Sequence, residues 1–145
     1  MAGNVSQKKY LTAFINNSPT VRENAGADIT NAAHKAVMYD DGGNAVLATA
    51  GDKAVGVVLS TARSNENDAG DALLTKKGMA IDILVKDIGL IEAAGAIKKG
   101  DALTVNAGRA AVAAAGDFIF GWAFSSAVAA GELVHIQITK SGRYN

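Results

Sequence analysis

An internal repeat with an offset of 65 residues constrains the fold more than any other feature of this sequence. Residues 44–62 align with residues 109–127 without a gap, which places Gly51-Asp52 on Gly116-Asp117. The other matched positions are Gly43 with Gly108, Gly56 with Gly121, and Ser60 with Ser125. Because the matches fall in turns and in apolar segments alike, the sequence predicts a duplicated strand-and-turn unit.

A glycine followed by an acid recurs ahead of the apolar segments. Beyond a loop that is four residues longer in the first repeat, Gly70-Asp71 aligns with Gly131-Glu132, and Gly100-Asp101 follows the same pattern. Glycine adopts backbone angles that other residues resist, and a carboxylate accepts hydrogen bonds from nearby amides. We therefore expect structural turns at Gly51, Asp52, Gly70, Asp71, Gly100, Asp101, Gly116, Asp117, Gly131 and Glu132.

Short apolar segments between turns predict a mainly β protein. The expected strands cover residues 35–39, 45–48, 54–59, 73–75, 79–86, 89–92, 102–105, 110–113, 118–124 and 133–139, and residues 93–98 are compatible with one helical turn. In the last strand, His135, Gln137 and Thr139 alternate with apolar neighbours, as in a half-buried strand. Strands this short, with a turn every 8–12 residues or so, are typical of a small β-barrel or sandwich.

The composition of the chain changes near residue 32. Residues 1–31 are polar and irregular, and we expect an extended N-terminal arm there. A β domain is expected over residues 32–145, with repeats at about 35–86 and 100–140. In the arm, Tyr10, Leu11, Phe14 and Ile15 form one apolar cluster, which is either a short helical face or an anchor for a partner.

Charge and residue usage argue against several classes of function. The 14 Lys and Arg residues balance 14 Asp and Glu residues, whereas nucleic-acid-binding proteins usually carry a basic excess. The absence of cysteine excludes disulfides, thiolate catalysis and zinc–sulfur sites. No apolar run approaches the ~20 residues that a spanning helix needs. We expect neither nucleic acid nor a membrane as a partner, and synthesis in a cytoplasm.

No combination of residues predicts an active site. His34 and His135 are the only histidines and lie far apart in the sequence, so a metal site is not expected. The run of residues 40–44, DDGGN, lacks the spaced acids and closing Glu of a calcium loop and is interpreted as a turn. Neither a nucleophile elbow nor a phosphate-binding loop occurs. We therefore expect a protein that is not an enzyme and uses no cofactor.

Aromatic residues gather in one expected strand. Phe118, Phe120, Trp122 and Phe124 alternate at period two in this segment. This pattern favours a ridge in the core, and an aromatic patch at a subunit interface is the alternative.

The sequence resembles the capsid cement, or head decoration, proteins of tailed phages in four stretches: AVGVVLSTA, AGDALLTKKGMAIDILV, KKGDALTV and FGWAFSSAVAAGELVHIQI. The shared pattern is a Gly before a hydrophobic strand, a loop of small residues, and an Ala-Gly-acid turn before a Val-rich strand. The resemblance covers about residues 35–140. It implies a β-rich domain, often a homotrimer, that sits on the outer capsid surface of the virion and clamps neighbouring subunits of the major capsid protein.

The same resemblance suggests a role for the arm. Tyr10, Leu11, Phe14 and Ile15 would be its contacts with the capsid, because buried aromatic side chains carry much of the binding energy of interfaces. A phage tail or baseplate protein and a carbohydrate-binding β module are the alternatives. The carbohydrate module is disfavoured because such modules expose aromatic side chains, whereas the one Trp here lies in an apolar strand.

Overall fold

The computed structural model describes residues 19–60 and 74–145, and these residues form three antiparallel sheets. The protein is mainly β, as predicted, and the described residues form no helix. The strands are β1 (Thr20–Asn24), β2 (Ile29–Thr30), β3 (Ala36–Tyr39), β4 (Ala45–Leu47), β5 (Gly56–Ser60), β6 (Leu74–Thr75), β7 (Ala80–Leu84), β8 (Asp87–Glu92), β9 (Ala102–Asn106), β10 (Arg109–Val112), β11 (Phe118–Ala123) and β12 (Leu133–Arg143).

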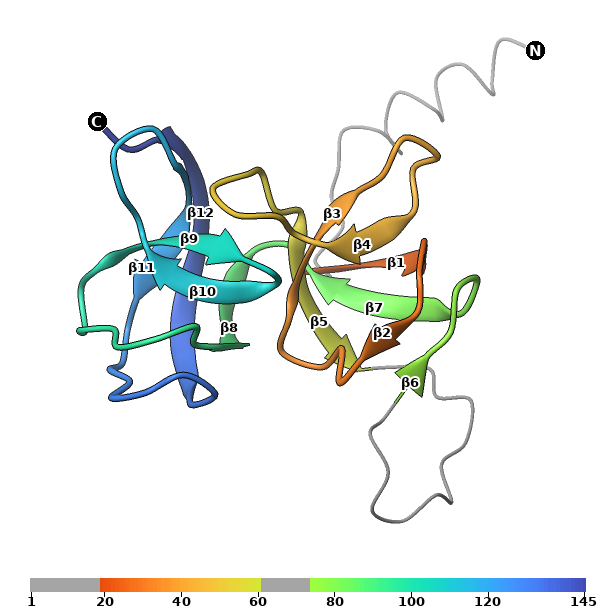
Figure 1. Ribbon diagram of the computed structural model, residues 1–145, viewed down its shortest axis with the longest axis horizontal. Coiled ribbons are helices and arrows are strands. Elements are labelled where there is room, and N and C mark those ends of the chain that lie inside the picture. The colour runs from red at the N-terminus through yellow and green to blue at the C-terminus, as the bar shows by residue number, and fades with distance from the viewer. Residues whose placement is uncertain (1–18, 61–73) are drawn as a thin grey trace, which may run out of the picture.

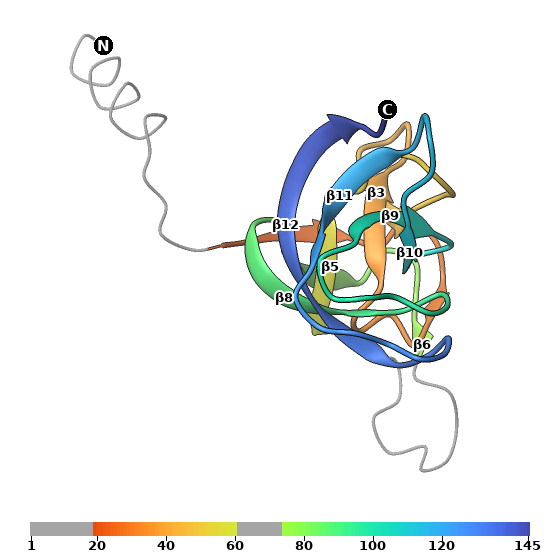
Figure 2. The same ribbon diagram turned by 90° about the vertical axis from the view of Figure 1, so that its left-hand side faces the viewer.

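Two five-stranded sheets stand side by side and account for most of the molecule (Figure 1). The first has the order β1-β7-β5-β3-β4, and β2 pairs with β6 below it. The second, read from its β8 edge, has the order β8-β12-β11-β9-β10. Figure 2 shows how strongly the long strand β12 curves around the second sheet. None of the three sheets in the described part of the chain closes into a barrel, so the fold is sandwich-like.

The two large sheets are copies of one unit, because each strand of the first has a counterpart at the same place in the second. We call residues 20–84 the first copy and residues 87–143 the second copy. In each copy a single parallel bridge links the two edge strands, Ala25 with Ala45 and Ala93 with Ala110. The predicted duplication is therefore present in three dimensions.

Two glycines fix the register of this duplication. A Cβ on Gly56 would lie 2.1 Å from the carbonyl oxygen of Leu84, and a Cβ on Gly121 would lie 2.1 Å from that of Gln137. No side chain fits at either place, so β5 approaches β7 as closely as β11 approaches β12. The offset of 65 residues between Gly56 and Gly121 is thus a structural equivalence.

The extra residues of the first copy are placed differently from the sequence alignment. The N–H of Gly78 donates to the carbonyl of Ala25 at 2.8 Å, and the N–H of Gly131 donates to that of Ala93 at 2.8 Å. Both glycines have a positive φ, 92° and 93°. The counterpart of Gly131-Glu132 is therefore Gly78-Met79 and not Gly70-Asp71, which lies outside the described residues.

The arm boundary also differs from the prediction. β1 pairs along β7, from Thr20 with Leu84 to Asn24 with Ala80, and it is the counterpart of β8. Residues 20–30, which the sequence assigned to the arm, thus belong to the first copy. Residues 93–98 are not a helical turn, because Ala93 forms an isolated bridge with Ala110 and Ile97 forms one with Ala127, with a bend between them.

Buried side chains join the two copies into one body. One cluster fills the first copy (Ile29, Ala32, Val37, Ala45, Val58, Ile81 and Ile83). A larger one fills the second copy and continues onto the first, where it includes Ala36, Val57 and Leu84. Each fully buried Val, Leu or Ile contributes about 1.5–3 kcal/mol, so the shared cluster makes the stability of each copy depend on the other.

Candidate interaction surface

Two Gly-acid pairs of the second copy, Gly100-Asp101 and Gly116-Asp117, lie in turns with the same hydrogen-bond pattern. In the turn before β9, the N–H of Asp101 donates to Lys98 O at 3.0 Å, and its carboxylate accepts from the Lys98 N–H at 2.8 Å. Asp117 makes the same pair of contacts with Ala114, at 3.0 and 2.9 Å. The preceding Gly100 and Gly116 have φ of 96° and 93°, a region that favours glycine.

Two further pairs vary this pattern. The Glu132 carboxylate accepts from the N–H groups of Val128 and Ala129, at 2.6 and 2.5 Å, beside Gly131. Asp52, after Gly51, accepts from the hydroxyl of Thr49 at 3.4 Å and from the N–H of Lys53 at 2.8 Å. These carboxylates are engaged with the backbone of their own turns, which is a structural use of the acid.

The four arm residues predicted to contact a partner, Tyr10, Leu11, Phe14 and Ile15, lie outside the residues that the structure describes. Their role stays a prediction. The described residues instead present a surface that includes Trp122 and Phe124, two of the aromatic residues for which the sequence left an interface patch as the alternative to a core ridge.

That surface is the outer side of the second sheet. Trp122 and Ile88 both lie opposite Gln137, one on each neighbouring strand. Leu90 lies opposite His135, and the Phe124 N–H donates to His135 O at 2.8 Å. Opposed residues, and residues two apart on a strand, share a face. We call this surface the apolar face; its large apolar residues are Ile88, Leu90, Trp122, Phe124 and Leu133.

The apolar face is open to solvent. The exposed fractions are 47% for Ile88, 39% for Trp122, 47% for Phe124 and 45% for Leu133. Contiguous apolar patches on a protein surface commonly mark interaction sites. The predicted core ridge is therefore wrong for Trp122 and Phe124, although Phe120 is buried at 2%. The period-two spacing of the aromatic residues predicts that Trp122 and Phe124 share one face of a strand. It does not predict whether another part of the molecule covers that face.

The corresponding face of the first copy is covered or charged over most of its extent, although Leu59, the counterpart of Phe124, is 42% exposed. Val57 and Leu84, the counterparts of Trp122 and Gln137, are 0% and 5% exposed within the core shared with the second copy. Where the apolar face has Leu90 and His135, the first copy has an exposed ion pair, Arg22 Nε to Asp82 Oδ1 at 3.0 Å. In the first copy this face is therefore mostly buried or carries charged side chains. In the second copy it is apolar and open to solvent.

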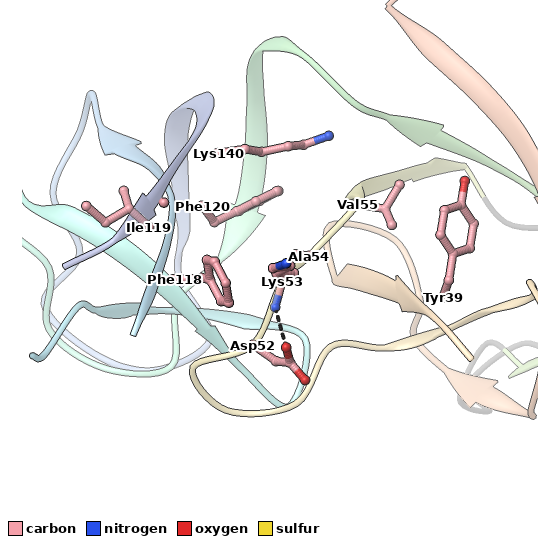
Figure 3. A pocket seen from close by; sticks show the side chains of 10 residues that line it. Tyr39, Asp52, Lys53, Ala54, Val55, Phe118, Ile119, Phe120 and Lys140 are labelled. Atoms are coloured by element: carbon pink, nitrogen blue, oxygen red, sulfur yellow. Dashed lines mark hydrogen bonds between the residues drawn. The ribbon is translucent and has the colours of Figure 1, made fainter. Parts of the chain in front are cut away.

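A second feature is a pocket of about 410 Å³ between the copies (Figure 3). Tyr39 and Val55 line it from the first copy, and Phe118, Phe120 and Lys140 line it from the second. Most of this lining is apolar, with ammonium groups at its margin.

The pKa values of two side chains that line the pocket are shifted by their surroundings. Partial burial lowers the pKa of Lys140. Burial, and then the nearby Glu23 carboxylate, raise the pKa of Tyr39. The Phe118 ring lies against two cations, with Arg143 Cζ at 4.0 Å and Lys53 Nζ at 4.8 Å from its centroid. Such cation–π contacts orient the ring at the pocket wall.

Residues 19–60 and 74–145 contain no group of three or more His, Asp or Glu side chains that could hold a metal ion. His135 lies on a strand and is exposed, as the strand pattern predicted. In the segment 40–44, Asp40 Oδ1 accepts from the N–H groups of Gly42 and Asn44, both at 2.9 Å, as in a turn. Within the same described residues, no helix is long and apolar enough to cross a membrane.

Comparison with known proteins identifies the family. A family model described as structural cement protein (E217 gp24/Pam3 gp6) matches residues 2–139. Among solved structures, the head fiber gp8.5 N base of bacteriophage phi29 is similar, with a TM-score of 0.52 and 21% identity over 87% of this chain and 98% of that one. At this identity the likeness concerns the fold. No curated protein sequence matches the chain. Because the family match covers nearly its whole length, the chain belongs to the phage structural cement protein family.

Proposed function

We propose that this phage structural protein binds the outer surface of the assembled head and stabilises contacts between subunits of the major capsid protein. The observation that carries the proposal is the match to the cement family over residues 2–139, which includes the polar N-terminal segment as well as both copies. A cement protein needs surfaces rather than chemistry. Each added contact raises the free energy required to separate neighbouring capsid subunits.

The described surface suits this role better than it suits catalysis. The acids of the described Gly-acid turns bind their own backbone, and four large side chains of the apolar face are exposed. We therefore propose that the protein is not an enzyme and acts as a homo-oligomer, so that several docking sites act together. Linked sites bind more tightly than single ones because the second contact forms at a high effective concentration.

The N-terminal segment is the proposed capsid anchor, with Tyr10, Leu11, Phe14 and Ile15 as its contacts. Supporting this, the family match begins at residue 2. The test is a chain that lacks residues 2–18. The deletion stops before β1, because loss of that strand would uncover the edge of β7. Occupancy on purified heads should fall, while the far-UV circular dichroism of the protein stays unchanged.

A finer variant combines Tyr10→Ser with Phe14→Ser, and its matched control combines Gln7→Ala with Asn16→Ala in the same segment. The apolar pair should lower occupancy and the polar pair should not. Unchanged occupancy for both the deletion and the apolar pair would contradict the anchor.

Because Trp122 is exposed, its place in an apolar strand does not argue against a carbohydrate-binding module. His135 and Gln137 share this face, but the large exposed neighbours of Trp122, namely Ile88, Phe124 and Leu133, are apolar, whereas sugar sites surround aromatic rings with many hydrogen-bonding groups. Apolar neighbours favour a protein partner. The position of the protein on a virion in electron micrographs separates a head protein from a tail or baseplate protein.

A further inference from the structure

The equivalent face is mostly buried in the first copy and exposed in the second. The structure of the chain shows what covers this face in the first copy. Leu84 reaches into the second copy, where a Cβ on Gly89 would lie 2.4 Å from its Cδ2. The turn between β9 and β10 closes over the same sheet, since Ala36 N–H donates to Gly108 O at 2.6 Å and Gly108 N–H donates to Ala48 O at 2.9 Å. The cover is therefore one end of the second copy.

The corresponding end of the first copy is uncovered. Val105, Phe120 and Ile138 of the second copy are 0%, 2% and 6% exposed beneath the first. By strand register their counterparts are Tyr39, Val55 and Val85. Tyr39 is 47% exposed, and Val55 and Val85 are half-buried. We call these three residues the open end of the first copy.

The residue sizes on the two unpaired surfaces are complementary. Inside the chain, the small Val57 belongs to the same core cluster as the large Phe120. On the two unpaired surfaces the sizes are exchanged. The apolar face of the second copy has the large Trp122 where the first copy has Val57, and the open end of the first copy has the small Val55 where the second copy has Phe120. The pocket of about 410 Å³ lies beside Val55 and Tyr39, which provides room for a large aromatic side chain.

We propose that the apolar face of one chain docks on the open end of the first copy of a second chain, repeating between molecules the contact made between the two copies. This inference rests on the proposed function and names the surface through which its oligomer forms. The contact joins two different surfaces, so it is heterologous. It builds a ring where the rotation closes and a filament where it does not.

Trp122 is the only tryptophan, so its fluorescence reports this contact directly. Between about 1 and 100 µM, a range that includes interfaces of micromolar Kd, the mass by sedimentation should rise as protein concentration increases. Over the same range, Trp122 emission should shift to shorter wavelength and acrylamide quenching should fall. Trp122→Glu should weaken association at least about 30-fold, as expected for an aromatic hot spot.

Tyr39→Lys tests the other surface. It should abolish both the mass increase and the fluorescence shift although Trp122 is intact. Val112→Lys, a charge placed at a residue that is 49% exposed and lies on neither surface, should leave both unchanged. Phe124→Glu on the apolar face gives a second loss of association if Trp122→Glu impairs folding.

Mixing the two defective variants is the decisive experiment. Each alone should be monomeric, but each keeps one intact surface, so a mixture of Trp122→Glu and Tyr39→Lys should form a one-to-one dimer and nothing larger. A Tyr39→Lys protein that still associates alone would overturn the proposal, because the apolar face would then pair with itself. A wild-type chain that stays monomeric yet binds heads would overturn it too and leave the cement function standing. An oligomer that binds no heads would contradict the function alone.

Discussion

A largely buried ion pair links the two copies across their boundary, in addition to the shared apolar cluster. Glu92 of the second copy forms an ion pair with Lys35 of the first at 3.3 Å, and Arg109 contacts the same oxygen, Oε2. The side chains of Lys35 and Glu92 are only 10% and 20% exposed. Lys35 also donates to Asn31 O at 3.0 Å. These contacts to Oε2 are ion pairs rather than well-aligned hydrogen bonds.

Glu92→Gln removes this charge and keeps the size of the side chain. Two cations then face each other, and Lys35 stays largely buried without an opposite charge. Loss of one partner from a buried pair costs about 3–5 kcal/mol. Because a fifth of the Glu92 side chain is exposed and Lys35 keeps its bond to Asn31, we expect about 2–3 kcal/mol, or a Tm lower by roughly 6–10 °C in a chain of this size.

Urea unfolding followed by circular dichroism measures the change. Lys35→Met should cost less, about 1 kcal/mol, because Arg109 still neutralises Glu92. Arg22→Met is the matched control, since it breaks the ion pair with Asp82 in which the Arg22 side chain is 71% exposed, and it should have no measurable effect. A Glu92→Gln protein within about 0.5 kcal/mol of the wild type would refute the reasoning.

Two further substitutions test the packing and the pocket. Gly56→Ala and Gly121→Ala should each cost about 3 kcal/mol or more in urea unfolding, because the new Cβ meets a carbonyl oxygen, whereas Gly95→Ala, with no atom within 4 Å, should be nearly neutral; equal effects at all three would contradict the register. Burial lowers the pKa of Lys140, so between that lowered value and 10.5 the unfolded chain binds more protons than the folded chain and stability rises with pH. Lys140→Met should stabilise the protein at neutral pH and flatten this rise, and an unchanged pH profile would contradict it.

Most of the strands follow from the sequence because glycine turns separate them clearly. The expected strands 102–105 and 110–113 match β9 and β10 within one residue at each end. The pairing of β1 with β7 was missed because its signal is short and its offset is 68 rather than 65. Residues 24–29, NAGADI, lie at this offset from residues 92–97, EAAGAI, and that similarity was the available clue.

The exposure of the apolar face could not be predicted in the same way. Period-two alternation assigns Trp122 and Phe124 to one face of a strand, but exposure depends on what covers the sheet. The choice of Gly70-Asp71 as the counterpart of Gly131-Glu132 failed for a related reason. The backbone bond from Gly78 to Ala25 defines this turn, and that bond needs a glycine with positive φ but no acid beside it.

The function that we propose is reinforcement of a phage head from outside. The most direct measurement compares purified heads imaged with and without the protein and then heated until they rupture. We expect density on the outer surface across the junctions between capsid subunits, and rupture at a lower temperature when the protein is absent. Density inside the head or on the tail, or equal rupture temperatures with and without the protein, would contradict it.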